Sequence, residues 1–96
     1  MMRTYFAIVH KDPGSAYGLE FPDVPGCFGA GDTFEEAVKN ARDALRLHLE
    51  TAAELGRAPP HIRSFETLMA DPEIRNLAAD RPLVGISLLE ELAPGE

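Results

Sequence analysis

Four carboxylates stand close together in the first third of the chain. Glu20, Asp23, Asp32 and Glu35 fall between positions 20 and 35. Carboxylate oxygens are the ligands that Mg²⁺ prefers, and a bound Mg²⁺ can promote hydrolysis of a phosphodiester. The spacing of these residues therefore raises the hypothesis of a metal-dependent nuclease. The competing hypothesis is that acidic groups here, chiefly Glu20, Asp23 and Asp32, bind a basic partner.

The other reactive side chains match no known site pattern. His10, His48 and His61 are widely separated, and Cys27 is the single cysteine. This spacing fits no zinc motif, and one cysteine cannot form an internal disulfide. We therefore expect surface or structural histidines, a small buried Cys27, and no metal or cofactor.

The glycine-rich run at positions 26–31, GCFGAG, is superficially similar to a phosphate-binding loop. Its spacing is not the dinucleotide fingerprint, and no Lys-Ser or Lys-Thr pair follows it. Acidic residues at the start of the next helix would also repel phosphate. Tight turns and close packing explain these glycines better than a nucleotide site does.

Composition and charge favour a protein partner over nucleic acid. The chain has 96 residues, a formal net charge of −7 and 45% apolar residues, which is typical of one soluble domain over residues 1–96. No segment is basic, whereas nucleic-acid-binding modules carry Lys and Arg stripes. We expect no direct nucleic-acid binding by this chain alone and attraction to a basic protein, although acidity that serves only solubility fits equally well.

Neither a membrane span nor a secretion signal is visible in the sequence. No apolar run is long enough to cross a bilayer, and the start MMRTYFAIVH lacks the layout of a signal peptide. The sequence therefore predicts a cytoplasmic protein.

The first part of the chain has the pattern of three short strands. Residues 3–10 are rich in β-branched and aromatic side chains, and apolar residues on both faces indicate an interior strand. A turn signal at Asp12-Pro13-Gly14 precedes alternating residues at 17–21, which predicts an antiparallel hairpin. A loop at 22–26 and a short strand at 27–30 follow.

The rest of the chain predicts a long helix, short helices and a last strand. Thr33 and Glu36 form a capping-box pattern, an apolar stripe continues for about 22 residues, and Gly56 ends the helix. Pro59-Pro60 is a stiff link, and short helices start near positions 64 and 71. Residues 83–89 alternate as a strand, and residues 91–96 read as a flexible tail. We predict an α+β fold in which an antiparallel sheet of three N-terminal strands and one C-terminal strand carries its helices on one face.

The segment 17–37, YGLEFPDVPGCFGAGDTFEEA, resembles the signature of the HicB family of antitoxins. Family members commonly carry a Tyr-Gly strand, a Pro-Asp-x-Pro-Gly-Cys loop and a Gly-Asp-Thr-x-Glu-Glu-Ala helix start. The resemblance covers about residues 3–90. The motif residues with an expected structural role are Pro22, Pro25, Gly26, Cys27, Gly31, Thr33, Glu36 and Ala37.

This resemblance implies a partial, degenerate ribonuclease H-like fold and a function without catalysis. Nucleases of the ribonuclease H fold carry an acidic residue on the first strand, and residues 3–10 contain none. The resemblance instead implies an antitoxin of a type II toxin-antitoxin system, which neutralises a small basic mRNA-cleaving toxin of the HicA type by direct binding. The alternative is a homo-oligomeric binding or scaffold protein of the same fold without a toxin partner. A residual metal-dependent nuclease is the third reading.

Many HicB proteins continue into a domain that binds the operator of their own genes. This sequence stops at Glu96 after the last predicted strand. We therefore expect no C-terminal DNA-binding domain in this chain, and operator binding does not carry over.

Candidate contact residues lie on and beside the second predicted strand. Acidic groups would meet cationic toxin residues, and aromatic side chains would anchor the contact. The reading that the aromatic residues are sheet core and that the last acidic residue only flanks the helix cap is equally compatible. Exposed sheet edges also predict a homo-oligomer, a dimer or larger. The candidate contact residues are Tyr17, Glu20, Phe21, Asp23 and Asp32.

Overall fold

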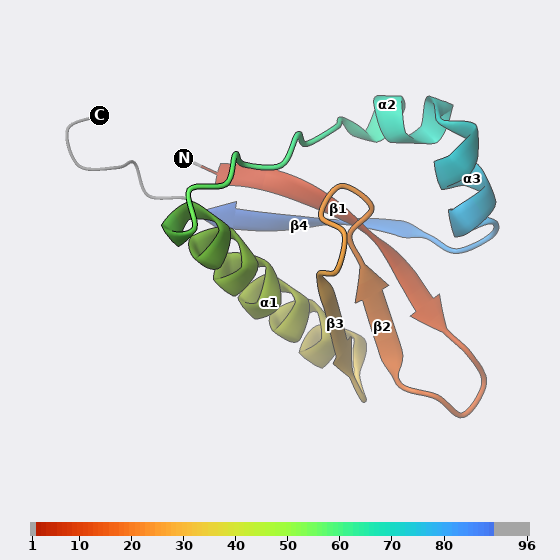
Figure 1. The fold of residues 1–96 in the computed structure, drawn as a ribbon. Coiled ribbons are helices and arrows are strands. Elements are labelled where there is room, and N and C mark those ends of the chain that lie inside the picture. Colours follow the sequence, from red (N-terminus) through yellow and green to blue (C-terminus); the bar gives the residue numbers. More distant parts are fainter. Residues whose placement is uncertain (1, 90–96) are drawn as a thin grey trace.

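The computed structural model describes residues 2–89, and their fold is α+β, as the sequence predicts (Figure 1). The tail predicted at 91–96 lies outside the described residues. In chain order the elements are β1 (Met2–Lys11), β2 (Tyr17–Glu20), β3 (Phe28–Gly31), α1 (Phe34–Glu54), α2 (Phe65–Ala70), α3 (Pro72–Ala78) and β4 (Leu83–Leu89).

The four strands form one antiparallel sheet in the order β3-β2-β1-β4. The interior position predicted for the first strand is confirmed. The turn between β1 and β2 is closed by a hydrogen bond from the Ser15 amide to the Asp12 carbonyl, and Gly14 has a φ of 76°. Because β3 and β4 have neighbours on one side only, they are the two edges of the sheet.

Helix α1 forms where the sequence places it. The hydroxyl of Thr33 accepts a hydrogen bond from the Glu36 amide, and Gly56 follows the last turn with a φ of 71°. One detail of the capping box differs, because the Glu36 carboxylate accepts from the amide of Asp32 rather than from that of Thr33. The effect is similar, since a free amide at the helix start still gains an acceptor.

The main core lies between α1 and one face of the sheet. Odd-numbered residues of β1 and β2 point toward the helix because side chains alternate along a strand. The β3 glycines Gly29 and Gly31 let the helix approach closely; a Cβ on Gly31 would lie 2.6 Å from the amide nitrogen of Ala37. The core comprises Tyr5, Ala7, Leu19, Phe21, Val24, Cys27, Ala37, Ala41, Leu45, Ile86 and Leu88.

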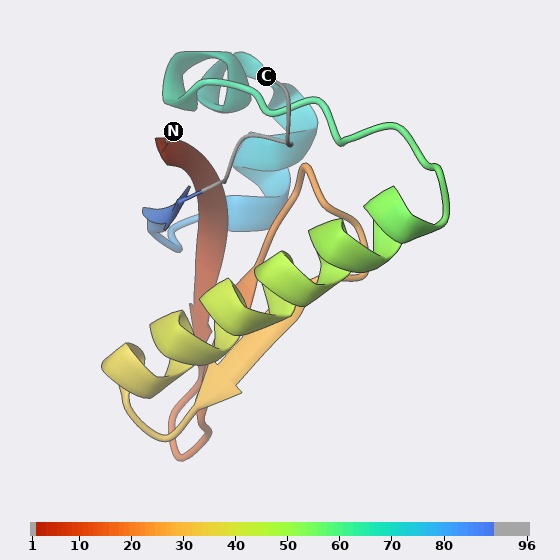
Figure 2. The same cartoon turned by 90° about the vertical axis from the view of Figure 1, so that its left-hand side faces the viewer.

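The expectation that all helices lie on one sheet face is wrong for α2. Phe6 points away from the main core, and its ring lies 5.8 Å from the ring of Phe65 in α2. Figure 2 shows α1 crossing in front of the sheet, with α2 and α3 grouped at its upper end. Residues on both faces of β1 are thereby buried, including Ile8, which is fully covered although it points away from α1. Strand alternation was visible in the sequence, but the direction taken after the Pro59-Pro60 link was not.

Candidate functional site

The face of β2 and β3 opposite α1 carries no helix of residues 2–89. We call this area the β2–β3 surface and define it by Gly18, Glu20, Phe28 and Ala30. Cross-strand pairs place Gly18 beside Ala30 and Glu20 beside Phe28. The small residues leave a shallow hollow of about 260 Å³, and the Phe28 side chain is 58% exposed beside it. The surface therefore combines an accessible aromatic ring with an adjacent carboxylate.

Glu20 has one partner on this surface. Its Oε1 lies 3.2 Å from Nε2 of His10, and both side chains are about one-third exposed. This partner is a histidine, and no Lys or Arg of residues 2–89 forms an ion pair with Glu20. The partly exposed Glu20 carboxylate is therefore open to a cation from a binding partner.

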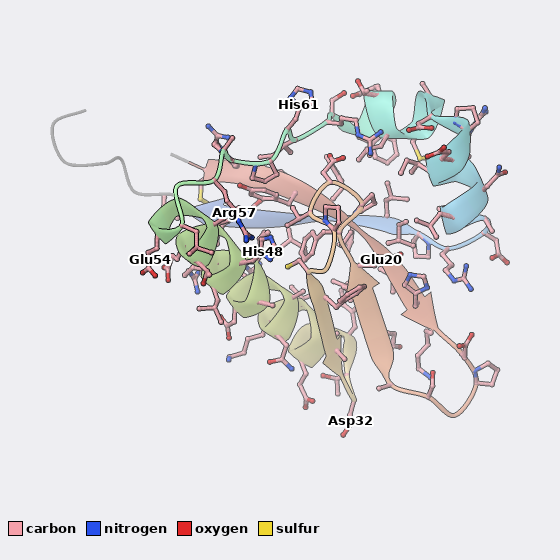
Figure 3. All side chains as sticks on the ribbon, in the orientation of Figure 1. Glu20, Asp32, His48, Glu54, Arg57 and His61 are labelled. Carbon is pink, nitrogen blue, oxygen red and sulfur yellow. The ribbon has the colours of Figure 1, made fainter. Side chains whose placement is uncertain are left out.

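A second acidic group lies where β3 passes into α1. Asp32 and Glu35 are exposed and have no Lys or Arg partner within residues 2–89. Phe28 pairs with Glu20, and Asp32 follows Phe28 by four residues, so Asp32 lies roughly 13 Å from Glu20 along the strand direction. In Figure 3, Asp32 points away from the ribbon beyond β3, whereas Glu20 lies on the sheet.

Asp23 has a different environment from the other predicted acidic contacts. Its carboxylate accepts hydrogen bonds from the backbone amide of Arg63 at 2.8 Å and from Nε of Arg63 at 2.7 Å. The same guanidinium donates to Asp71 at 2.8 Å. Hydrogen bonding to Asp23 raises the pKa of Arg63. The Glu73 amide and then Arg63 lower the pKa of Asp71. Asp23 therefore ties the 22–26 loop to the segment before α2.

The two predicted aromatic anchors are both on the α1 side of the sheet. Phe21 is 2% exposed and belongs to the core, in agreement with the alternative that the aromatic residues are part of the sheet core. Tyr17 is half-buried, with its ring 6.0 Å from that of Phe34 and the Lys11 ammonium 5.4 Å from its centre. The accessible aromatic side chain on the β2–β3 surface is Phe28, which the sequence reasoning missed. Gly29 faces α1, and side chains alternate along a strand, so Phe28 points away from α1. This alternation was the signal in the sequence that could have identified Phe28.

Cys27 is buried, as predicted, and burial raises the pKa of its thiol. Within residues 2–89, no three His, Cys, Asp or Glu side chains come together as metal ligands would. In the same part of the chain no helix has the length and apolar character needed to cross a bilayer.

A larger cleft of about 610 Å³ lies at the other end of α1. It is lined by Arg3, Arg46 and Arg57 over an apolar floor that includes Tyr5 and Leu49. Figure 3 shows Arg57 near this end of the helix. Glu50 also lines the cleft, and Arg46 is paired with Asp43 at 3.3 Å, so side chains of both charge signs meet there.

Comparison with known proteins identifies relatives along most of the chain. A family model described as HicB_like antitoxin of bacterial toxin-antitoxin system matches residues 5–91. The chain is 40% identical over 71 residues to an uncharacterized 14.9 kDa protein in the rep-hol intergenic region of Haemophilus phage HP1, covering 74% of this chain and 53% of that protein. It therefore spans about half the length of this relative.

Solved structures show the same fold. The Burkholderia pseudomallei antitoxin HicB is 37% identical with a TM-score of 0.75, and the match covers 90% of this chain and 63% of that one. A chain in a structure described as the HicA3 and HicB3 toxin-antitoxin complex is 28% identical with a TM-score of 0.67, covering 88% of this chain and 94% of that one.

Proposed function

This chain belongs to the family of HicB_like antitoxins of bacterial toxin-antitoxin systems, and from that premise we propose that it neutralises a small basic HicA-type ribonuclease by direct binding. The observation that carries the proposal is the match over residues 5–91. The likeness to a chain from a toxin-antitoxin complex supports it. In this proposal the chain is a stoichiometric inhibitor in the cytoplasm, is not an enzyme, and binds the toxin rather than nucleic acid.

Electrostatics supports the proposal and points to a region of contact. A chain of net charge −7 attracts a basic protein over a distance of several ångströms and speeds the encounter. Asp32 and Glu35 have no Lys or Arg partner in residues 2–89, so they can pair with toxin cations without first breaking an internal ion pair. We assign the toxin contact to the β2–β3 surface together with Asp32.

The exposed ring of Phe28 gives this contact an apolar anchor. Aromatic residues at the centre of an interface carry a large share of binding energy, because their burial removes much apolar area from water. Phe28 lies directly opposite Glu20 on the neighbouring strand, and Asp32 follows the other end of β3. In contrast, Phe21 is already buried and Asp23 is already bound to Arg63.

The first test is copurification of this chain with a short basic protein encoded beside it. RNA cleavage by that protein is then measured with and without an equimolar amount of this chain. The proposal expects a stable complex and loss of cleavage when the two are equimolar. A neighbouring protein that cleaves RNA equally well in the presence of an excess of this chain would contradict it.

The second test locates the contact by charge reversal. Glu20→Lys and Asp32→Lys are each expected to raise the toxin Kd about tenfold, which corresponds to about 1.4 kcal/mol. Phe28→Ala is expected to weaken binding by a similar or larger factor. Glu54→Lys is the matched control, because Glu54 is exposed at the far end of α1, about 30 Å of helix from Asp32. Equal weakening by all charge reversals would mean that only net charge matters.

A further inference from the structure

Helices α2 and α3 cover a small core that is separate from the main core under α1. Ile8 of β1 faces away from α1 and is fully buried, and on the same sheet face the Phe6 ring meets the Phe65 ring of α2. Figure 1 shows both helices far from the C-terminal end of α1 and joined to it by an extended link. Buried residues of this second core, which do not belong to the main core, are Ile8, Leu68, Ile74 and Ala78. The α2–α3 segment, residues 64–81, is therefore held by contacts of its own.

A charged contact ties this segment to the rest of the protein. Arg63, which comes just before the segment, is anchored on the 22–26 loop by its two hydrogen bonds to Asp23, and the side chain of Ile62 packs against the main core. From this fixed position, Nη1 of Arg63 donates to the Asp71 carboxylate at 2.8 Å, between α2 and α3. The contact between Arg63 and Asp71 therefore acts as a latch between the fixed part of the fold and the α2–α3 segment.

The other end of the segment holds backbone strain. The Arg81 amide donates to the Ala78 carbonyl at 2.7 Å, which closes a turn with Ala79 and Asp80 at its centre. Ala79 has a φ of 52° and a ψ of −115°, which is the first central position of a type II′ turn, where glycine is the usual residue. A residue with a side chain stays in this conformation only while its surroundings hold it there. The strain at Ala79 therefore favours release of the segment, whereas the latch and the small core oppose it.

The residues beneath the segment lie next to the β2–β3 surface. The strand register places Ile8 beside Glu20, and Glu20 beside Phe28, so the three side chains form one row across the sheet on the face opposite α1. In the structure Ile8 is fully covered, and Glu20 and Phe28 are the accessible members of the row. Movement of the segment away from the sheet would continue this row into an apolar strip that consists of Ile8 and Phe6.

We propose that residues 64–81 form a lid that opens as a unit while α1 and the sheet stay folded, and that opening uncovers the strip of Phe6 and Ile8 beside Glu20. The latch and the small core hold the lid closed, and the strained turn at Ala79 lowers the cost of opening. The open form is then a minor state of the folded protein, and the lid sets how much apolar surface this sheet face presents. The inference does not depend on the proposed function, because it rests on the packing and backbone of the segment alone.

The test is residue-resolved amide exchange of the purified chain at several low urea concentrations. The amides of Leu68, Arg75 and Ala79 donate to carbonyls within the segment, so they report its opening. The proposal expects these amides to share one opening free energy, to exchange about tenfold or more faster than the amides in the middle of α1, and to have a smaller but measurable urea dependence. Protection and urea dependence equal to those of α1 would overturn it, since the segment would then open only by global unfolding. Unequal rates without urea dependence would also overturn it, because they indicate fraying of each helix by itself.

Two alanine-to-glycine substitutions test the strained turn. Ala79→Gly removes the strain of the closed form and is expected to slow exchange of the lid amides by about fivefold. Ala70→Gly makes the same change at the exposed last residue of α2, which has a negative φ, and is expected to speed exchange. Faster exchange in both variants would show that Ala79 stores no strain that favours opening.

Two arginine-to-methionine substitutions test the latch. Arg63→Met removes the guanidinium that reaches Asp71 and is expected to speed exchange of the lid amides by about fivefold or more. Arg75→Met is the matched control, because Arg75 is exposed on α3 and forms no ion pair within residues 2–89, and a change of less than about twofold is expected. Protected α1 amides verify that each variant is folded. An equal effect of both substitutions would overturn the role of the latch.

Discussion

Gly29 of β3 lies directly against the backbone of Ala41 in α1. A Cβ atom on Gly29 would overlap the nitrogen and Cα of Ala41, neither of which can move by a side-chain rotation. The helix packs at its present distance from the sheet because this strand residue has no side chain. The close approach also fixes which way the neighbours of Gly29 point, so Phe28 and Ala30 face away from α1.

Gly29→Ala is therefore expected to be among the most destabilising single-methyl changes in the chain. Overpacking commonly costs about 1 to 3 kcal/mol, and the rigid backbone of Ala41 places this site at about 3 kcal/mol or above. Urea unfolding measures the effect. Gly18→Ala is the matched control, since its new Cβ would meet the nearest atom, His10 Cβ, at 3.8 Å and should cost less than about 1 kcal/mol. Similar losses for both variants would show that strand glycine itself, rather than the helix contact, sets the cost.

Thr33→Ala is expected to destabilise the protein by about 1 kcal/mol through loss of the α1 cap. The Thr33 hydroxyl accepts the Glu36 amide at 3.1 Å, and alanine leaves that amide to water. Thermal unfolding compares Thr33→Ala with Thr33→Ser, which keeps the acceptor and should stay close to the parent chain. A loss of equal size in both variants would assign the effect to the threonine methyl group instead.

Asp23→Asn is expected to reduce stability while leaving toxin affinity per folded molecule unchanged. The Asp23 carboxylate accepts two hydrogen bonds from Arg63, and charge-assisted bonds of this kind contribute about 1.5 to 3 kcal/mol each. Asparagine can keep one acceptor but loses the charge, so a total loss of about 2 kcal/mol is expected. Chemical unfolding and toxin titration on the same samples separate the two effects. If Asp23→Asn instead kept full stability but bound the toxin more weakly, Asp23 would be part of the toxin contact.

The sequence predicts those features that depend on neighbours within one turn or one strand. The Thr33 cap, the end of α1 at Gly56 and the interior position of β1 follow from local patterns, and each is confirmed. The contact between Asp23 and Arg63 joins residues 40 positions apart and has no local signal. Glu20 and Asp32 were predicted correctly as accessible acidic groups. The contact between α1 and the sheet has no local signal either, and for that reason Phe21 was chosen as an aromatic contact in place of Phe28.

Acid should weaken the protein through Asp71, whose pKa is lowered first by the Glu73 amide at 2.9 Å and then by Arg63. A carboxyl group with a lowered folded-state pKa stabilises the protein above its unfolded pKa of about 3.9, and this stability is lost as the pH falls through the folded-state pKa. Asp71→Asn keeps a helix cap but removes the charge. The difference in unfolding free energy between the parent chain and this variant should be constant from neutral pH to about pH 5 and shrink below about pH 4. Urea unfolding at several pH values measures this difference. Asp80→Asn is the control for net charge, because Asp80 has no basic partner within residues 2–89. A difference that stays the same down to pH values at which carboxylates are protonated would show that Asp71 acts through its shape as a cap and not through its charge.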